Sequence, residues 1–89
     1  MSYKVKLTKT AQKIYLKLSP KLRISLDKCF AQLEYEPRID RNIKKLKGYK
    51  NDYRYRVGGW RIIYEIDEVQ KLVSVYDIGP RGDVYKHGH

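Results

Sequence analysis

The stretch NDYRYRVGGWRIIYEIDEVQKLVSVYDIGPRGDVYK, residues 51–86, decides the fold of this 89-residue chain. It predicts three short antiparallel strands followed by a basic, aromatic tail. The first strand, Tyr53–Val57, alternates tyrosine and arginine with the period of two that is typical of a half-buried strand. Gly58–Gly59 then allows a tight hairpin, because glycine adopts positive φ at no steric cost. Arg61–Ile66 and the β-branched run Leu72–Ile78 are the second and third strands.

Two amphipathic helices are expected before this stretch. Tyr3–Leu7 alternates apolar and basic residues and predicts an opening strand. Thr8 and Ser19 each precede a helical pattern and can act as N-caps, and Pro20 suits the first helical position. The second helix should end before Pro37, whose ring disfavours helical geometry in the preceding residue. The apolar stripes comprise Ala11, Ile14, Tyr15 and Leu18 in the first helix and Leu22, Leu26, Cys29, Phe30 and Leu33 in the second.

These elements predict an α+β fold in the order β-α-α-β-β-β. We expect one antiparallel sheet of about four strands, with the N-terminal helical hairpin packed on one face as its hydrophobic cover. The other face and the loops at its rim would then be available for binding. Residues 38–50, RIDRNIKKLKGYK, are expected to form a basic connection with little regular structure. A chain of this length has room for one domain, which we place at residues 1–89.

The formal net charge is +10, from 20 lysines and arginines against 10 aspartates and glutamates. Charge of this size predicts attraction to a polyanion or to an acidic protein partner. Nucleic acid is the commonest polyanion, and an anionic membrane surface is the alternative. No stretch approaches the roughly 20 apolar residues of a membrane span, and the N-terminus lacks the apolar run of a signal peptide. The single cysteine, Cys29, excludes an internal disulfide and indicates a reducing, cytoplasmic location.

The common catalytic and cofactor-binding motifs are absent from the sequence. The only histidines are His87 and His89, near the C-terminus, and one cysteine leaves no CxxC pair. No metal-ligand spacing and no glycine-rich phosphate loop emerges, so we expect neither a metal nor a cofactor.

Arginines among aromatic residues are the remaining chemical signal. Strand pleating puts Arg54 and Arg56 on one face, together with Arg61 of the next strand if the tyrosines face the helices. Guanidinium is always charged and its fork matches two phosphate oxygens, so such a cluster suits stabilisation of a reacting phosphodiester. The alternative is that these arginines form ordinary cross-strand ion pairs with Glu65 and Asp77.

Four motifs follow one another along the chain: Lys45–Gly48 (KLKG), Tyr53–Gly58 (YRYRVG), Trp60–Tyr64 (WRIIY) and Ile78–Tyr85 (IGPRGDVY). This pattern resembles the RelE/ParE superfamily of bacterial and archaeal toxins, and is most similar to its RelE branch. The resemblance implies the toxin of a type II toxin–antitoxin pair, a ribosome-dependent mRNA endonuclease that cuts through attack of the 2′-OH without a metal. It also implies a RelB-like antitoxin, acidic or amphipathic, that wraps the toxin. The charge of +10 favours a partner that is acidic and partly disordered and that folds on binding.

Carried over by position, the resemblance implies roles for individual residues. Arg61 matches the family's phosphate-stabilising arginine, and Arg81 matches the arginine proposed as general acid for the leaving 5′-oxygen. Tyr85 matches the tyrosine that stacks on or orients the substrate base. The presence of these three together favours the nuclease branch. Arg54 and Arg56 fall where some members carry two lysines, one of them proposed as general base.

The basic connection supplies further candidates for RNA contact. Lys44, Lys45, Lys47 and Lys50 are expected to lie against phosphates when the chain docks on ribosomal RNA. Two other functions are left open by the sequence. The ParE branch shares the fold but inhibits DNA gyrase, and a non-enzymatic basic binding module would carry the same charged surface.

Overall fold

The computed structural model describes residues 2–48 and 51–80 of the chain. Its elements are β1 (Lys4–Leu7), α1 (Lys9–Leu16), α2 (Pro20–Tyr35), β2 (Ile43–Lys45), β3 (Asp52–Val57), β4 (Trp60–Asp67) and β5 (Leu72–Pro80). The predicted order β-α-α-β-β-β is confirmed except for one additional short strand, β2. The three strands expected in residues 51–86 correspond to β3, β4 and β5.

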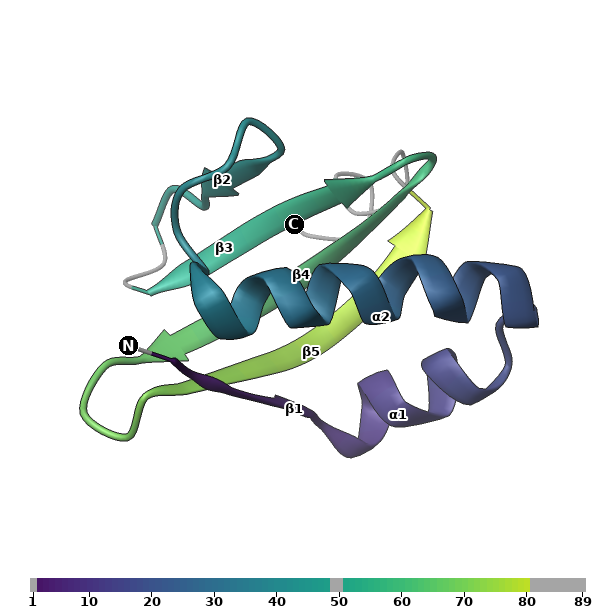
Figure 1. Cartoon of the computed structure of the whole chain (residues 1–89), viewed down its shortest axis with the longest axis horizontal. Helices are drawn as coiled ribbons and strands as arrows, with labels where there is room; N and C mark the ends of the chain where they lie inside the picture. Colours follow the sequence, from purple (N-terminus) through teal and green to yellow (C-terminus); the bar gives the residue numbers. More distant parts are fainter. Residues whose placement is uncertain (1, 49–50, 81–89) are drawn as a thin grey trace.

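The strands form one sheet in the order β1-β5-β4-β3-β2 (Figure 1). This sheet has five strands rather than the four that we expected. The β2–β3, β3–β4 and β4–β5 pairs are antiparallel, but β1 runs parallel to β5. The expectation of a wholly antiparallel sheet is therefore wrong at this edge. The alternation within a strand reports which side chains are buried, and it carries no information about the direction of the partner strand.

The expectation of an irregular segment at residues 38–50 is wrong at Ile43–Lys45. Ile43 is 8% exposed and pairs with Tyr55 of β3, so one apolar side chain anchors this edge strand in the core. The carbonyl of Asn42 accepts a 2.9 Å hydrogen bond from the backbone N–H of Arg56 and extends the pairing. Lysine has low strand propensity but is common on sheet edges, where it hinders pairing with other chains. A three-residue strand with two lysines therefore gave no clear signal.

Both helices begin where the sequence predicts. Thr8 and Ser19 each accept a hydrogen bond from the backbone N–H three residues further on, at 3.2 and 3.3 Å. These bonds satisfy helical donors that have no partner within the helix. Pro20 occupies the first turn of α2. The helix ends before Pro37, because Glu36 adopts the extended backbone that a following proline favours.

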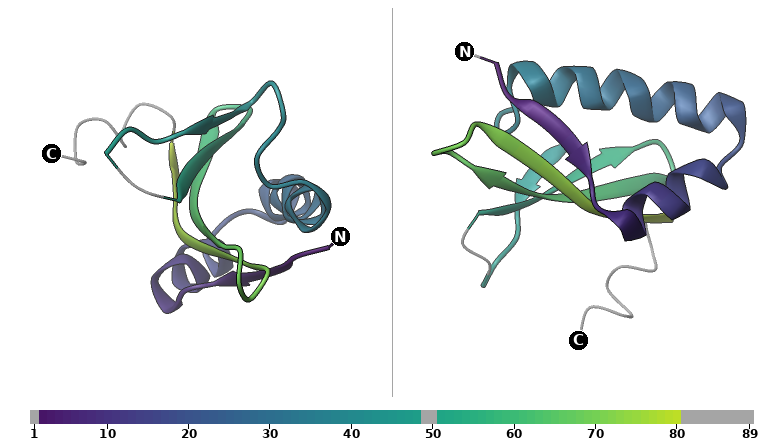
Figure 2. Two further views of the ribbon diagram at one scale, coloured as in Figure 1. Left: turned by 90° about the vertical axis from the view of Figure 1, so that its left-hand side faces the viewer. Right: turned by 90° about the horizontal axis from the view of Figure 1, so that it is seen from below.

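The two helices pack against the sheet and bury one of its faces. Figure 2 shows α2 lying over this face, while α1 closes the edge formed by β1 and β5. The buried cluster comprises Ala11, Leu26, Cys29 and Leu33 from the helices and Ile43, Tyr55, Ile62, Tyr64, Ile66, Val73, Val75 and Ile78 from the strands. The predicted core face of β3 and β4 is thereby confirmed. The opposite face of the sheet carries the arginines.

Candidate functional site

Three arginines lie together on the sheet face opposite α2. In the β3–β4 register Arg56 pairs with Arg61 and Arg54 pairs with Ile63, whereas Tyr55 pairs with Ile62 within the core. Neighbouring residues of a strand point to opposite faces, so the tyrosine positions and the arginine positions separate. The predicted grouping of the arginines is confirmed.

The middle of this arginine face is buried, contrary to our expectation of an open surface. Arg54 and Arg61 are 6% and 4% exposed. Ile63, which pairs with Arg54 and follows Arg61 by two residues on β4, is 3% exposed. Both arginines belong to central strands that have a neighbour on each side, so adjacent side chains cover their apolar stems. Arg56, next to the β3–β4 hairpin, is half-buried.

Arg61 has the best-defined surroundings of the three. Its Nη1 lies 3.2 Å from Oδ2 of Asp77 on β5, which is the distance of an ion pair, although its geometry is not that of a hydrogen bond. The guanidinium also packs against Gly79, where an added Cβ would lie 3.1–3.3 Å from three guanidinium atoms. The alternative of cross-strand ion pairs thus holds for Arg61.

Two nitrogens of Arg61 are buried without a hydrogen-bond acceptor. Within residues 2–48 and 51–80, neither Nε nor Nη1 has one. Buried side-chain donors almost always find an acceptor, and the exceptions call for an explanation such as strain or a catalytic role. An anionic oxygen is the acceptor that a guanidinium binds most strongly. Arg61 is therefore the described residue best suited to hold a phosphate.

The predicted RNA-contacting lysines do not share one surface. Lys44 pairs with Arg54 and lies on the arginine face, whereas Lys45 pairs with Tyr53 and points to the other side of β2. Both are exposed, as is Lys47 in the turn that follows. The structure therefore joins Lys44 alone of these three to the arginines.

Three predicted site residues, Arg81, Tyr85 and Lys50, lie outside the described residues. Their assignments remain predictions from the sequence. Conversely, the sequence pattern indicates Asp77 only as a cross-strand ion-pair partner and does not point to Gly79 at all. Both residues lie beside Arg61. Their proximity to Arg61 follows only from the register between β4 and β5, which the sequence does not reveal.

Residues 2–48 and 51–80 contain no group of three or more histidine, cysteine, aspartate or glutamate side chains arranged to hold a metal ion. In the same residues, neither helix has the length and hydropathy needed to cross a membrane.

Comparison with known proteins decides the family. A family profile described as ParE toxin of type II toxin-antitoxin system, parDE, matches residues 5–85. The chain belongs to the RelE/ParE superfamily. It is a toxin of a type II toxin–antitoxin system, as the sequence motifs predicted. The comparison with curated proteins found no match.

Solved structures of RelE toxins resemble this RelE/ParE chain over nearly its whole length. Archaeal RelE in its complex with RelB from Pyrococcus horikoshii is 30% identical, with a TM-score of 0.81 over 92% of this chain and 98% of that one. The isolated E. coli RelE toxin is 27% identical, with a TM-score of 0.79 over 98% and 95% of the chains. A toxin–antitoxin complex, RelBE, from Mycobacterium tuberculosis is 28% identical, with a TM-score of 0.78 over 91% and 100%.

Proposed function

We propose that this toxin is a ribosome-dependent mRNA endonuclease that cleaves RNA through attack of the 2′-OH on the adjacent phosphate. The observation that carries the proposal is Arg61, a buried guanidinium with two donors lacking acceptors, on a face shared with Arg54, Arg56 and Lys44. The likeness to RelE structures supports the same branch of the superfamily.

The chemistry requires fixed positive charge more than it requires a metal. Attack of the 2′-oxygen forms a new P–O bond, releases the 2′-OH proton to water, and breaks the bond to the 5′-oxygen. Negative charge builds on the phosphate oxygens during this step. A guanidinium that is already in place stabilises this charge more in the transition state than in the ground state. Arg61 would hold the scissile phosphate, and Arg54 and Arg56 would add to the field around it.

Two residues beyond the described part of the chain complete the proposed site. Arg81 would protonate the leaving 5′-oxygen, and Tyr85 would stack on a base and keep the attacking oxygen in line with the leaving one. Both assignments follow from the family motif in residues 78–85.

Primer extension on a translated transcript after induction of the toxin tests the proposal. The parent should cut the transcript within codons that occupy the ribosomal A site, while Arg61→Ala and Arg81→Ala should abolish cleavage and relieve growth arrest. Arg23→Ala on α2, away from the arginine face, is the matched control and should cleave like the parent. If folded Arg61→Ala and Arg81→Ala proteins both cleave at the parent's rate, the site is wrong.

A second candidate function follows from the family profile, which describes ParE toxins. A ParE-like toxin would inhibit DNA gyrase. Induction would then produce covalent gyrase–DNA complexes while mRNA stays intact, and the same cells can be assayed for both products. Gyrase complexes without mRNA loss would replace the first proposal.

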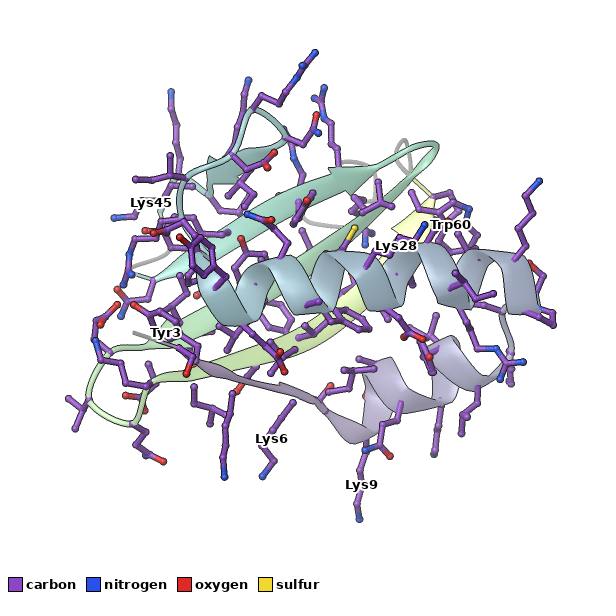
Figure 3. All side chains as sticks on the ribbon, viewed as in Figure 1. Tyr3, Lys6, Lys9, Lys28, Lys45 and Trp60 are labelled. Carbon is purple, nitrogen blue, oxygen red and sulfur yellow. The ribbon has the colours of Figure 1, made fainter. Side chains whose placement is uncertain are left out.

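An antitoxin is the proposed partner, as in the RelB complexes of the relatives. The structure offers a groove of about 440 Å³ between β1 and α1, lined by Val5, Lys6, Leu7, Gln12, Tyr15 and Leu16. Lys6 and Lys9 point outward along this edge in Figure 3. An apolar groove with a basic rim suits an acidic segment that carries apolar side chains and folds on binding.

Titration of the toxin with the protein encoded by the neighbouring gene tests this partner. We expect a complex at micromolar concentration or below, and at least tenfold weaker binding by Leu16→Glu in the groove. Val69→Glu, at a residue that is 93% exposed on the β4–β5 turn, is the control and should bind like the parent. Equal affinity for both variants would remove the groove from the interface.

A further inference from the structure

The pairing of β4 with β5 contains an irregularity beside Arg61. Ile63 pairs with Asp77 and Tyr64 pairs with Val75, so the register shifts at this point and Tyr76 is one extra residue on β5. This is a β-bulge, in which two residues of one strand lie opposite one residue of the next. Bulges interrupt the alternation of faces and redirect the side chains that follow.

The bulge places two consecutive side chains on the arginine face. Val75 and Ile78 both belong to the core cluster, so the core-facing pattern advances by three residues instead of two. Between them, the Tyr76 hydroxyl donates a hydrogen bond to a carboxylate oxygen of Asp52, across β4, and the Asp77 carboxylate faces Arg61. Without the bulge, strict alternation would point Asp77 into the core with Val75.

We propose that Asp77 is a positioning residue, which the bulge presents to Arg61 so that the guanidinium is held ready for the scissile phosphate. The proposal rests on the RNA-cleaving function proposed above. Three observations support it: the 3.2 Å ion pair, the 5% exposure of the Arg61 side chain, and the bare Cα of Gly79 against the guanidinium. The Asp77 carboxylate fixes one side of the Arg61 guanidinium. Gly79 has no side chain, so it leaves the space that this guanidinium occupies.

A positioning role has a kinetic signature that a simple counter-ion would not have. Removing the Asp77 carboxylate makes the face more positive, so RNA should bind at least as tightly as before. The guanidinium would meanwhile lose its fixed position, and preorganised charge is what lowers the barrier. The rate at saturating substrate should therefore fall while the affinity does not, as expected when an interaction specific to the transition state is lost.

The first experiment measures the guanidinium directly, by NMR of the arginine side-chain N–H groups in the free toxin. The Arg61 signals, assigned by their loss in Arg61→Lys, should show restricted rotation in the parent. Asp77→Ala should release this restriction, and Gly79→Ala should shift the signals. Asp77→Asn should retain part of the restriction, because its amide oxygen can still lie beside Nη1 of Arg61 and attract it as a dipole. Glu65→Gln, an exposed carboxylate on the same face of β4, should leave the Arg61 signals unchanged. Free rotation in the parent, or unchanged signals in Asp77→Ala, would overturn the proposal.

The second experiment measures single-turnover cleavage of ribosome-bound mRNA and binding to ribosomes whose mRNA carries a 2′-deoxy substitution. We expect Asp77→Ala to cleave at least tenfold more slowly with no loss of affinity, and Asp77→Asn to recover part of the rate. In an Arg61→Ala background, Asp77→Ala should have no further effect on any residual rate or on affinity. The proposal would be overturned if Asp77→Ala and Arg61→Ala reduced the cleavage rate by independent, additive amounts, or if Asp77→Ala bound these ribosomes more weakly than the parent.

The failure of the proposed function has a different outcome. If the parent toxin does not cleave mRNA, the proposed function fails, and the NMR measurement alone decides whether Asp77 positions Arg61.

Discussion

The hydroxyl of Tyr64 on β4 donates a 2.6 Å hydrogen bond to the carbonyl oxygen of Pro37, 27 residues earlier in the chain. Tyr64 is fully buried, and this burial raises the pKa of its hydroxyl well above the usual range. The phenol therefore stays protonated and keeps donating. The bond ties the connection after α2 to the centre of the sheet, and it satisfies a carbonyl that water does not reach.

Replacing Tyr64 with phenylalanine should destabilise the fold. Phe fills the same space but leaves the Pro37 carbonyl without its donor, which costs about 1–3 kcal/mol. The melting temperature should fall by about 4–8 °C for each kcal/mol. Tyr35→Phe, at a residue that is 79% exposed, is the control and should melt with the parent. Thermal unfolding followed by circular dichroism measures both, and equal melting temperatures would show that this bond adds nothing.

Glu68, in the turn between β4 and β5, should make stability depend on pH. It is contacted by Lys71 at 2.5 Å, by the Tyr3 hydroxyl at 2.8 Å, and by Arg38 in an ion pair. The hydrogen bond from Lys71, followed by that from Tyr3, lowers the pKa of Glu68 from 4.5 to about 2. A carboxyl with a lowered folded-state pKa contributes stability that is present above its unfolded pKa and is lost as the pH falls toward the folded value.

Urea unfolding of the parent and of Glu68→Gln should show this window. The parent should lose more stability than the variant as the pH is lowered from roughly 5 to 2, because only the parent must protonate this carboxyl. Above that pH range the difference in unfolding free energy between the parent and Glu68→Gln should be constant. Parallel curves for the parent and Glu68→Gln at all pH values would contradict the prediction.

The two glycines of the β3–β4 hairpin should respond differently to alanine. Gly58 has φ +59°, in the left-handed region, whereas Gly59 does not have a φ of this kind, and neither has an atom within 4 Å of an added Cβ. Gly58→Ala should cost about 1–2 kcal/mol, the penalty of the left-handed conformation for an L-residue. Gly59→Ala should be neutral or slightly stabilising, because alanine restricts the unfolded chain. Equal unfolding free energies of the two variants would exclude conformation as the cause.

Lys44 and Lys45 offer a matched test of which sheet face binds RNA. They are adjacent and both exposed, but only Lys44 shares a face with Arg54. Lys44→Gln should weaken binding to single-stranded 2′-O-methyl RNA and reduce the slope of log affinity against log salt by about 0.7, the value for one phosphate contact. Lys45→Gln should leave that slope unchanged. Fluorescence anisotropy across a salt series measures the slope for each variant. An equal change in slope for both variants would show that RNA does not bind on the arginine face.

The clearest agreement between sequence and structure is in the helices and in the faces of β3 and β4. Thr8, Ser19 and Pro37 set the helix limits through contacts within a few residues, so a local pattern suffices to locate them. The alternation of Tyr55 and Arg54 likewise identifies the core face of β3. The sequence missed β2, because only Ile43 in that strand is apolar and its burial depends on pairing with another strand.

The sequence by itself determined the helix limits, the three main strands, the set of arginines on one face, and the motifs that identify a RelE/ParE toxin. These properties depend on local periodicity and on residue identity. Only the tertiary structure decided that β1 runs parallel to β5, that Arg54 and Arg61 are buried, and that a bulge turns Asp77 toward Arg61. The physical reason is that strand partners and register are set by packing between segments far apart in the chain, and a shift of one residue moves a side chain to the other face.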